Sequence, residues 1–505
     1  MPKNYIKKIL EARVYDVARE TPIDHARLLS ARLDNNVLLK REDLQPVFSF
    51  KLRGAYNKMH SLTDEERARG VVCASAGNHA QGLALAARHM DVKATIVMPR
   101  TTPKIKVDGV RSHQAKVVLI GDTFDEASAY AQKLVAEKGL VYVHPYDDPE
   151  VIAGQGTIGV EIMRQHPDPI YAIFVPVGGG GLLAGIVAYV KYVRPEVKII
   201  GVEPEDAACL QAAMARGRRV TLPEVGLFAD GVAVATIGKE PFRIIRKLVD
   251  EVITASTDEM CAAIKDIFED TRSIAEPAGA LALAGLKKYV ANGGVTGQTL
   301  IAIASGANTN FDRLRYISER TEIGEKREAV LSVMIPERPG SFKRFCSAMG
   351  KRGITEFNYR YAEGGEAHIF VGLQIAEGSE DRAEVVAGLQ TKGYPVVDLT
   401  DNEMAKLHIR HMVGGPAPAS ITDELAYRVE FPERPGALLN FLTHLGQRWN
   451  ISMFHYRNHG AAYGRVLLGL QAKASERKEI EAMLDSIHYR YSEETANPAY
   501  EIYLS

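Results

Sequence analysis

The chain has 505 residues, of which 46% are hydrophobic and 25% are charged. These proportions are typical of folded globular proteins and the length predicts about three domains, which excludes a largely disordered protein. Sixty-two Lys and Arg residues against 63 Asp and Glu residues leave a net charge of -1. The chain therefore lacks an overall positive field, and we expect neither nucleic acid nor a membrane as a partner.

The N-terminal segment is charged throughout and spaces its apolar residues along one helix face, so we expect a docked helix and no signal peptide. These apolar residues are Ile6, Ile9, Leu10, Val14 and Val17. The four cysteines lie far apart in the sequence, without the paired spacing of a zinc site or a disulfide framework. They are Cys73, Cys209, Cys261 and Cys346. A reducing, cytoplasmic location is therefore expected.

Up to about residue 320, short apolar runs alternate with helical patterns. Strands are expected at 70–74, 93–98, 115–120, 140–143, 170–177, 198–202 and 299–304, and helices at 80–89, 125–138 and 182–193. Continuous apolar strands separated by amphipathic helices predict parallel sheets that are covered on both faces. We therefore expect an α/β fold in two lobes for this part of the chain.

One stretch, 169–190, has no charged residue and is long enough to span a bilayer. Pro176 and the glycines Gly178–Gly181 interrupt it. A strand, a glycine loop and a helix are therefore favoured over a membrane span.

A lysine, Lys51, stands in the segment 49–55, whose sequence is Ser-Phe-Lys-Leu-Arg-Gly-Ala. A nucleophilic lysine must be partly desolvated so that its amine is neutral. The alternative is a surface lysine, which is the more frequent case for a lysine considered alone.

The segment from Ser75 to Gly82 follows a strand-like run and opens a helical pattern. Its small residues leave backbone N–H groups bare at the positive end of a helix, which suits a carboxylate. Asn78 can offer its side-chain amide to an oxygen. The alternative is an ordinary strand-to-helix turn in which Asn78 caps the helix.

Four successive glycines, Gly178–Gly181, follow an apolar strand and precede Leu182. They are costly in chain entropy and indicate backbone close to a ligand, with a phosphate at the helix N-terminus as the favoured one. Their spacing fits neither the dinucleotide fingerprint nor the nucleoside-triphosphate loop. Ser305, at the end of another strand, can reach the same crevice, although Ser-Gly after a strand is usually a turn.

A lysine, a carboxylate loop, a phosphate loop and a polar residue in one α/β scaffold together indicate pyridoxal 5'-phosphate. That cofactor needs a Schiff-base lysine, a phosphate cradle and a partner for its ring nitrogen. The non-enzymatic alternative is an amino-acid-binding protein that has lost catalysis, and the retained Lys51 argues against it.

The tail contains an internal repeat. Glu-Arg-Pro-Gly occurs at 337–340 and again at 433–436, and the segment 354–360 recurs as 451–457. Two α+β modules of strand-helix-strand-strand type are predicted, with the Gly- and Pro-rich stretch 411–420 between them. One hypothesis is a structural duplication, in which the copies pack sheet to sheet. The other is a sensor, because a Pro-Gly turn before a helix presents N–H groups to an amino-acid carboxylate.

In these motifs, and from near the N-terminus to the end, the chain resembles the fold-type II pyridoxal-phosphate enzymes. Within them it resembles the biosynthetic threonine dehydratases (threonine deaminases), which carry an ACT-like regulatory tail. The four motifs in this order are specific for the superfamily, and the doubled tail favours the regulated biosynthetic group. The resemblance implies a two-lobed, tryptophan synthase β-like catalytic domain over 1–320 and ACT-like modules over 327–400 and 422–505.

The resemblance also implies the roles of single residues, with Lys51 as the catalytic, Schiff-base lysine. The implied cofactor-binding residues are Phe50, Lys51, Asn78, Gly178, Gly179, Gly180, Gly181, Leu182 and Ser305. The implied substrate-binding residues are Ser75, Ala76, Gly77, Asn78 and His79. Tyr359 and Tyr456 occupy equivalent positions of the two repeats and are the expected allosteric residues. As the alternative, both tyrosines are simply core aromatics.

The implied reaction converts L-threonine to 2-oxobutanoate and ammonia, the committed step of isoleucine biosynthesis, with L-serine as a second substrate. The freed Lys51 amine removes the α-proton, and the β-hydroxyl leaves as water. The neutral Ser305 hydroxyl does not hold the ring nitrogen protonated, which favours elimination over transamination. Isoleucine as inhibitor, valine as the opposing effector and a homotetramer are further implications.

Serine dehydratase or serine racemase is the enzymatic alternative. Racemisation needs a second acid or base, and the racemase has a serine where this chain has Ala76. The racemase also binds a divalent cation through acidic residues in the stretch that matches 203–209. Glu203 and the Ala207 carbonyl suit a cation, but Cys209 stands where an aspartate is expected, so we expect no metal there.

Overall fold

The computed structural model describes residues 3–338, 340–350, 352–361, 365–376, 379–432, 437–446, 448–457 and 463–504. The chain forms two compact units, Met1–Thr321 and Glu322–Ser505. Within the described residues, none of the helices is long and apolar enough to cross a membrane. All four cysteines are buried.

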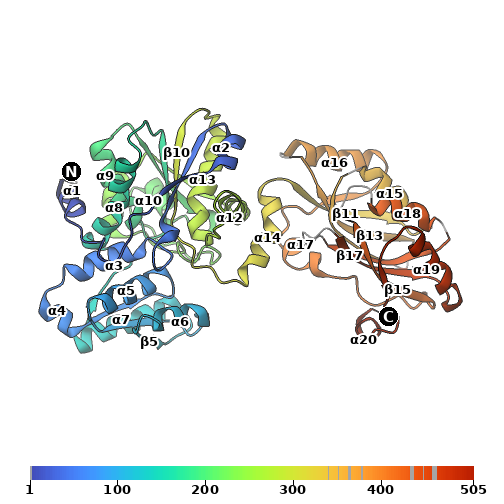
Figure 1. The fold of residues 1–505 in the computed structure, drawn as a ribbon, viewed down its shortest axis with the longest axis horizontal. Helices are drawn as coiled ribbons and strands as arrows, with labels where there is room; N and C mark the ends of the chain where they lie inside the picture. The colour runs from blue at the N-terminus through green and yellow to red at the C-terminus, as the bar shows by residue number, and fades with distance from the viewer. Residues whose placement is uncertain are drawn as a thin grey trace. The chain divides into compact units, whose positions relative to one another are not determined.

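The first unit contains two sheets, as the alternation of strands and helices predicts (Figure 1). The larger sheet has the strand order β1-β2-β10-β7-β8-β9 and is parallel except for the β1–β2 pair. The smaller sheet has the order β5-β4-β3-β6 and is parallel throughout. The strands of the larger sheet are β1 (Ile23–His25), β2 (Asn36–Arg41), β7 (Ala172–Pro176), β8 (Lys198–Pro204), β9 (Glu251–Ala255) and β10 (Thr299–Ala304). Those of the smaller sheet are β3 (Val71–Ala74), β4 (Ala94–Met98), β5 (Lys116–Leu119) and β6 (Val141–Tyr142).

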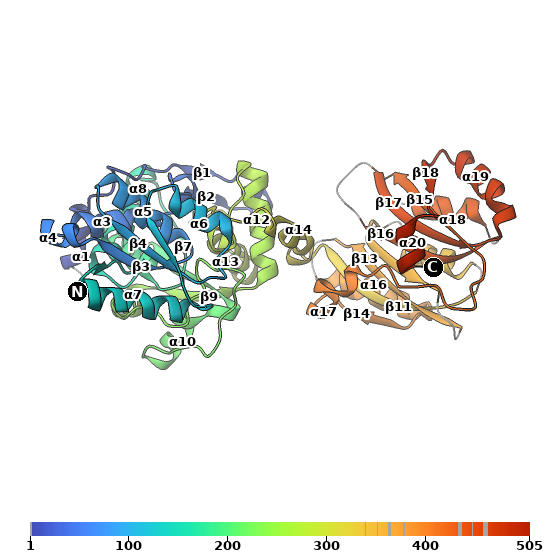
Figure 2. The ribbon, with the colours of Figure 1, turned by 90° about the horizontal axis from the view of Figure 1, so that it is seen from below.

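Helices cover both faces of these sheets because the central strands are apolar on both sides. On the smaller sheet, α7 covers one face, and α5 with α3 covers the other (Figure 2). The helices are α1 (Lys3–Leu10), α2 (Arg27–Leu33), α3 (Lys51–His60), α4 (Asp64–Arg69), α5 (Asn78–His89), α6 (Lys104–Arg111), α7 (Phe124–Lys138), α8 (Pro149–Gln165), α9 (Gly181–Val193), α10 (Cys209–Arg216), α11 (Lys239–Leu248), α12 (Thr257–Thr271) and α13 (Pro277–Gly293). Helix α14 (Arg313–Gly324) runs from the first unit into the second, and the short 3-10 turns are η1 (Glu42–Leu44) and η2 (Glu205–Ala207).

The uncharged stretch 169–190 forms strand β7, the glycine loop and most of helix α9, as predicted. The N-terminal helix is shorter than predicted, because α1 ends at Leu10, whose side chain is 62% exposed. Beyond it, the backbone N–H of Arg13 donates to Asn57 Oδ1 at 2.9 Å in place of a helical hydrogen bond. The chain then turns and packs Val14 against Leu52, in a different cluster from Ile9.

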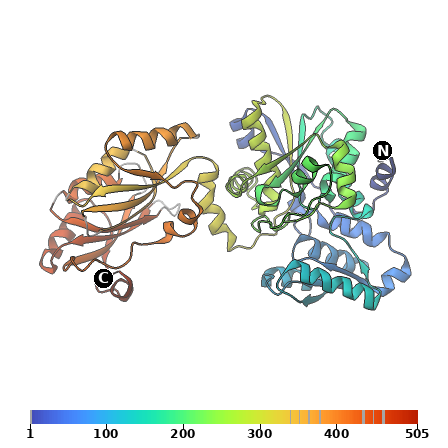
Figure 3. The ribbon, with the colours of Figure 1, turned by 180° about the vertical axis from the view of Figure 1, so that it is seen from behind.

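The second unit is a single eight-stranded antiparallel sheet over the described residues, in the order β14-β11-β13-β12-β16-β17-β15-β18. Its strands are β11 (Glu328–Pro336), β12 (Ile354–Arg360), β13 (Glu366–Gln374), β14 (Val396–Asp398), β15 (Glu424–Pro432), β16 (Asn450–Arg457), β17 (Tyr463–Gln471) and β18 (Tyr491–Glu493). Helices α15 (Ser341–Met349), α16 (Ser379–Thr391), α18 (Ala437–Leu445) and α19 (Arg477–Ser486) cover one face and share one core (Figure 3). The other face is partly covered by α17 (Glu403–Leu407), the turns around η3 (Ile409–His411) and α20 (Pro498–Tyr503).

The two repeats join edge to edge, which corrects the hypothesis of sheet-to-sheet packing. Strand β12 pairs antiparallel with β16, so that Tyr359 lies opposite Phe454 and Tyr456 opposite Phe357. Pairing satisfies the backbone groups that each module alone leaves open on its edge strand. The second Glu-Arg-Pro-Gly motif, 433–436, and Pro339 of the first lie outside the described residues.

A buried ionic network lies at the centre of the first unit. The Arg53 guanidinium on α3 donates to both oxygens of Glu42 at 2.8 Å and to Glu161 on α8 at 2.6 and 3.0 Å. Lys40 donates to the same Glu161 at 2.6 Å. All four side chains are fully buried, so the network joins β2, η1, α3 and α8 with its charges balanced.

Replacing Arg53 with alanine is therefore expected to destabilise the first unit by about 3–5 kcal/mol, because two carboxylates remain buried with one cation. The measurement is the urea midpoint followed by circular dichroism. Arg315→Ala is the control: the Arg315 side chain is exposed, and its ion pair with Glu319 should contribute about 0–1 kcal/mol. Equal shifts for the two variants would contradict a central role of the network.

Candidate active site

The start of helix α3 and the end of strand β10 lie side by side. The Phe50 N–H donates to the Ser305 carbonyl at 3.3 Å, and the Ala307 N–H donates to the Phe48 carbonyl at 2.9 Å. Phe48 adopts a left-handed conformation with φ of 54°, which a bulky residue keeps only where its neighbours hold it. This backbone pairing brings Ser305 next to Lys51, the first residue of α3.

The Lys51 amine is held in a desolvated position. Its Nζ donates to the Pro145 carbonyl at 3.1 Å and lies 5.3 Å from the centre of the Phe50 ring. Burial lowers the pKa of Lys51 to about 8, against the opposing attraction of Glu276. A substantial fraction of the amine is therefore neutral near physiological pH, as a nucleophile requires.

The glycine loop leads from β7 into α9. Gly180 has φ of 87° and is the N-cap of α9, and no side chain caps the helix. A Cβ at Gly179 would lie 2.1 Å from the ring of Tyr146, and one at Gly178 would lie 2.8 Å from the Cα of Val232. The glycines are thus required by close approach, and the first N–H groups of α9 are open to an anion.

Pro145 and Tyr146 connect the lysine with the glycine loop, since one accepts from Lys51 and the other packs over Gly179. Neither residue is predicted from the sequence. They belong to a loop without a motif, and only the tertiary structure brings that loop to the site.

The segment from Ser75 to Gly77 leads into α5, which begins at Asn78. Gly77 is the N-cap, so the alternative in which Asn78 caps this helix is wrong. Ser75, Ala76 and Gly77 are partly exposed, and a Cβ at Gly77 would meet no atom within 4 Å. The open N-terminus of α5 therefore has room for a carboxylate.

Two polar side chains of the site are buried and oriented. The His79 Nε2 lies 2.9 Å from the Val143 carbonyl, and burial lowers the pKa of His79 to about 3, so the ring is neutral. The Ser305 hydroxyl donates to the Ala278 carbonyl at 3.2 Å, and a hydroxyl can rotate to donate to a ring nitrogen instead.

Glu276, which is also not predicted from the sequence, lies just before the alanine-rich helix α13. It is 3% exposed and accepts a hydrogen bond from Asn78 Nδ2 at 2.5 Å. Burial raises the pKa of Glu276 to about 7. A carboxylate directly before a buried apolar helix was the signal available in the sequence.

These residues fit an aldehyde cofactor with a phosphate group. The site offers a partly neutral amine, an uncapped helix N-terminus behind four glycines, and a serine hydroxyl. In addition, the buried atoms Ser49 Oγ and His79 Nδ1 have no hydrogen-bond partner among the described residues. Unsatisfied buried polar atoms beside an amine and an anion site are expected where a polar ligand completes the structure.

Glu203 is the carboxylate that suits a cation in the stretch 203–209. It accepts hydrogen bonds from the backbone N–H groups of Leu210 and Gln211 at 2.7 and 2.8 Å. Burial raises the pKa of Glu203 to about 7. Its carboxylate thus serves the start of α10. Within the described residues, no group of three His, Cys, Asp or Glu side chains is arranged to hold a metal ion.

The two tyrosines of the repeats lie on the paired strands β12 and β16, and both are buried in the core of the second unit. The Tyr359 hydroxyl donates to Glu337 at 2.8 Å and lies 3.2 Å from the Ile451 carbonyl of the other repeat. Tyr359 therefore links the two modules. Its role toward an effector stays a prediction.

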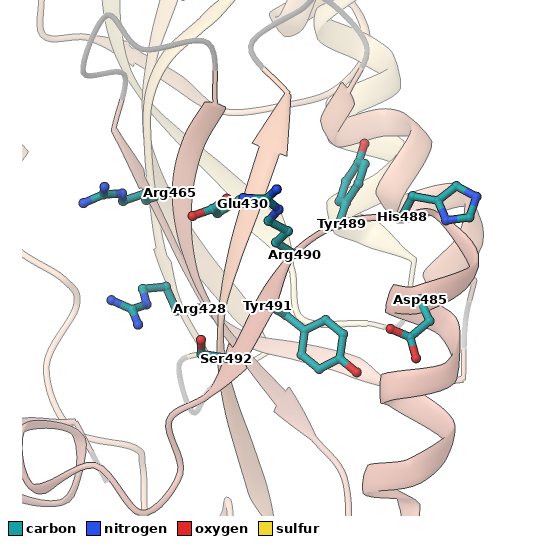
Figure 4. Close-up of a pocket in the computed structure, with 9 residues that line it drawn as sticks. All are labelled: Arg428, Glu430, Arg465, Asp485, His488, Tyr489, Arg490, Tyr491 and Ser492. Carbon is teal, nitrogen blue, oxygen red and sulfur yellow. The ribbon is translucent and has the colours of Figure 1, made fainter.

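The second unit also has an open cavity of about 690 Å³ at its β18 edge (Figure 4). Neither Tyr359 nor Tyr456 lines it. The lining residues are Arg428, Glu430, Arg465, Asp485, His488, Tyr489, Arg490, Tyr491 and Ser492.

Comparisons with known proteins agree with this geometry. Residues 14–306 match the family model "Pyridoxal-phosphate dependent enzyme", and residues 319–409 and 416–504 match "C-terminal regulatory domain of Threonine dehydratase". The chain is 57% identical to the biosynthetic L-threonine dehydratase of Burkholderia multivorans over 99% of both chains. Among solved structures, it is similar to threonine deaminase isoform 2 of Solanum lycopersicum (TM-score 0.62, 50% identity, 63% of this chain and 92% of that chain). It is also similar to maize serine racemase (TM-score 0.58, 31% identity, 62% of this chain and 95% of that chain).

Proposed function

Because this chain belongs to the pyridoxal-phosphate dependent enzymes and, within them, to the biosynthetic threonine dehydratase family, we propose that it deaminates L-threonine to 2-oxobutanoate and ammonia. We propose L-serine as a second substrate and isoleucine and valine as effectors of the second unit. The observation that carries the proposal is the desolvated Lys51 amine beside an uncapped glycine-rich helix N-terminus. We also propose that the protein is cytoplasmic and forms a homotetramer.

The chain's own residues supply the binding groups. The N–H groups at the start of α9, behind Gly178–Gly181 and including Leu182, would hold the cofactor's phosphate. Phe50 would flank the ring, Asn78 would face the ring oxygen and Ser305 would bind the ring nitrogen. When bound, the cofactor supplies an electron sink that stabilises negative charge on the substrate's α-carbon.

Lys51 then acts as the proton carrier. The start of α5, from Ser75 to His79, binds the substrate carboxylate and fixes the α-carbon. Lys51 Nζ, which is neutral in part because it is buried, removes the α-proton. The β-hydroxyl takes up a proton and leaves as water, and hydrolysis of the released enamine gives the oxo acid and ammonia.

Serine racemisation is disfavoured as the main activity. A racemase needs an acid or base on the face of the substrate opposite to the lysine. Ala76, whose methyl group carries no proton that can be transferred, stands at the position where the resemblance places that residue. The residues of this chain therefore favour elimination.

Replacing Lys51 with alanine is expected to abolish the visible absorbance of the purified protein and to lower threonine deamination by about a thousandfold or more. The assay measures 2-oxobutanoate with L-threonine and with L-serine. Lys58→Ala is the control, since Lys58 lies on the same helix and pairs with Asp148 at 2.8 Å. A purified wild-type protein without visible absorbance would contradict the proposal that the chain is a pyridoxal-phosphate enzyme.

Isoleucine is expected to inhibit threonine deamination and valine to relieve that inhibition. Tyr359→Phe removes the hydroxyl that joins Glu337 and Ile451 across the modules. It should raise the isoleucine concentration for half-inhibition about threefold to tenfold. Tyr394→Phe is the matched control, because its ring packs on Phe345 in the same module. If isoleucine does not change the rate of threonine deamination by the wild-type protein, the protein would be a catabolic or serine-directed enzyme and not the regulated biosynthetic one.

A further inference from the structure

Two carboxamides and one carboxylate form a hydrogen-bonded row in the active site. Asn308 Nδ2 donates to Asn78 Oδ1 at 2.6 Å, and Asn78 Nδ2 donates to Glu276 Oε1 at 2.5 Å. The row joins the end of β10, the start of α5 and the start of α13. Neither phosphate binding at Gly178–Gly181 nor proton transfer by Lys51 requires these contacts.

The direction of every hydrogen bond in this row follows from one backbone carbonyl. Asn308 Nδ2 also lies 2.8 Å from the Val47 carbonyl, which can only accept. This atom is therefore the nitrogen of Asn308, and its second N–H points to an oxygen of Asn78. The nitrogen of Asn78 must then face the carboxylate of Glu276, so that the amide of Asn78 has one orientation.

Glu276 is itself fixed by the backbone. Its N–H donates to the Gly306 carbonyl at 3.1 Å. A Cβ at Gly306 would lie 2.4 Å from Glu276 Oε1, so the glycine after Ser305 is required to make room for the carboxylate. The segment Ser305 to Asn308 is therefore part of this arrangement and not simply a turn.

We infer that Glu276 and Asn308 are positioning residues that orient the carboxamide of Asn78, so that one N–H is bound by Glu276 and the second faces the cofactor's ring oxygen. The inference rests on the proposed function and names two residues that the family motifs do not include. A carboxamide has two N–H groups, and the described residues give an acceptor for only one of those of Asn78. A fixed donor costs no reorganisation when the ligand binds.

The arrangement does not depend on the charge of Glu276. Burial, together with the nearby charge of Asp230, raises the pKa of Glu276 to about 7, against the opposing hydrogen bond from Asn78 and the positive charges of Lys106 and Arg313. Both the carboxylate and the carboxylic acid offer an oxygen to Asn78 Nδ2. Glutamine at this position also offers an oxygen, which separates orientation from charge in an experiment.

The test is a double-mutant cycle on Asn78 and Glu276. The dissociation constant for pyridoxal phosphate is measured by titrating the cofactor-free protein and following the visible circular dichroism band, which reports how the cofactor is oriented. Glu276→Ala should weaken binding about tenfold or more and change this band. In the Asn78→Ala background, Glu276→Ala should change the constant less than about twofold, because the two residues act through one group.

Two further variants keep the test decisive if Glu276→Ala fails to fold. Glu276→Gln should stay within about threefold of wild type, and Asn308→Ala should reproduce the loss of Glu276→Ala. The control is Glu328→Gln, which changes a buried carboxylate of the second unit whose pKa is also raised to about 7. It should leave the cofactor band unchanged.

The outcomes separate this inference from the proposed function. A wild-type protein that binds no cofactor contradicts the proposed function. Wild-type binding with an unchanged constant and band in Glu276→Ala overturns the inference alone. The inference is also overturned if Glu276→Ala weakens cofactor binding as much in the Asn78→Ala background as in the wild type. Glu276 would then act on the cofactor without Asn78. A Glu276→Gln variant as weak as Glu276→Ala would show that the charge matters and not the orientation.

Discussion

The buried pairing of Arg53 with Glu42 and Glu161 is the interaction on which the active site depends. It fixes the first turn of α3 against η1 and α8 with side chains that are fully buried. The two carboxylates outweigh the burial of the guanidinium and raise the pKa of Arg53, so its charge is permanent. Lys51 lies two residues earlier on the same helix, so the network also fixes its position. Among the described residues, Lys51 has no ionic partner at hydrogen-bond distance.

The remaining groups of the site come to Lys51 through backbone geometry. Residues 48–50 pair with residues 305–307. Ser305, which directly follows β10, therefore lies beside the start of α3. Under the proposed function, the helix N-termini of α5 and α9 would supply N–H groups for a carboxylate and a phosphate. Local backbone dipoles would then let a chain with a net charge of -1 bind anions without a global positive field.

Much of this arrangement was predictable from the sequence, because it depends on local patterns. The apolar strands, the glycines before α9 and the small residues before α5 are contiguous in the chain, and their physical requirements are visible there. Glu276, Pro145 and Tyr146 were not predicted, since they reach the site only by tertiary contacts over long sequence separations. For the same reason, the repeat predicted two modules but not their edge-to-edge pairing through β12 and β16. The early end of α1 also depends on a distant group, the Asn57 side chain.

The central claim is that burial in this framework makes Lys51 a partly neutral amine. The most direct measurement is the rate at which the cofactor-free protein reacts with pyridoxal phosphate as a function of pH, relative to free Nα-acetyllysine. Only the unprotonated amine attacks the aldehyde, so the rate rises with pH and reaches half its plateau at the pKa. The account predicts half the plateau at about pH 8, where an ordinary lysine would need a pH near 10.5. A protein rate that rises in parallel with that of the free amino acid up to pH 10 would contradict it.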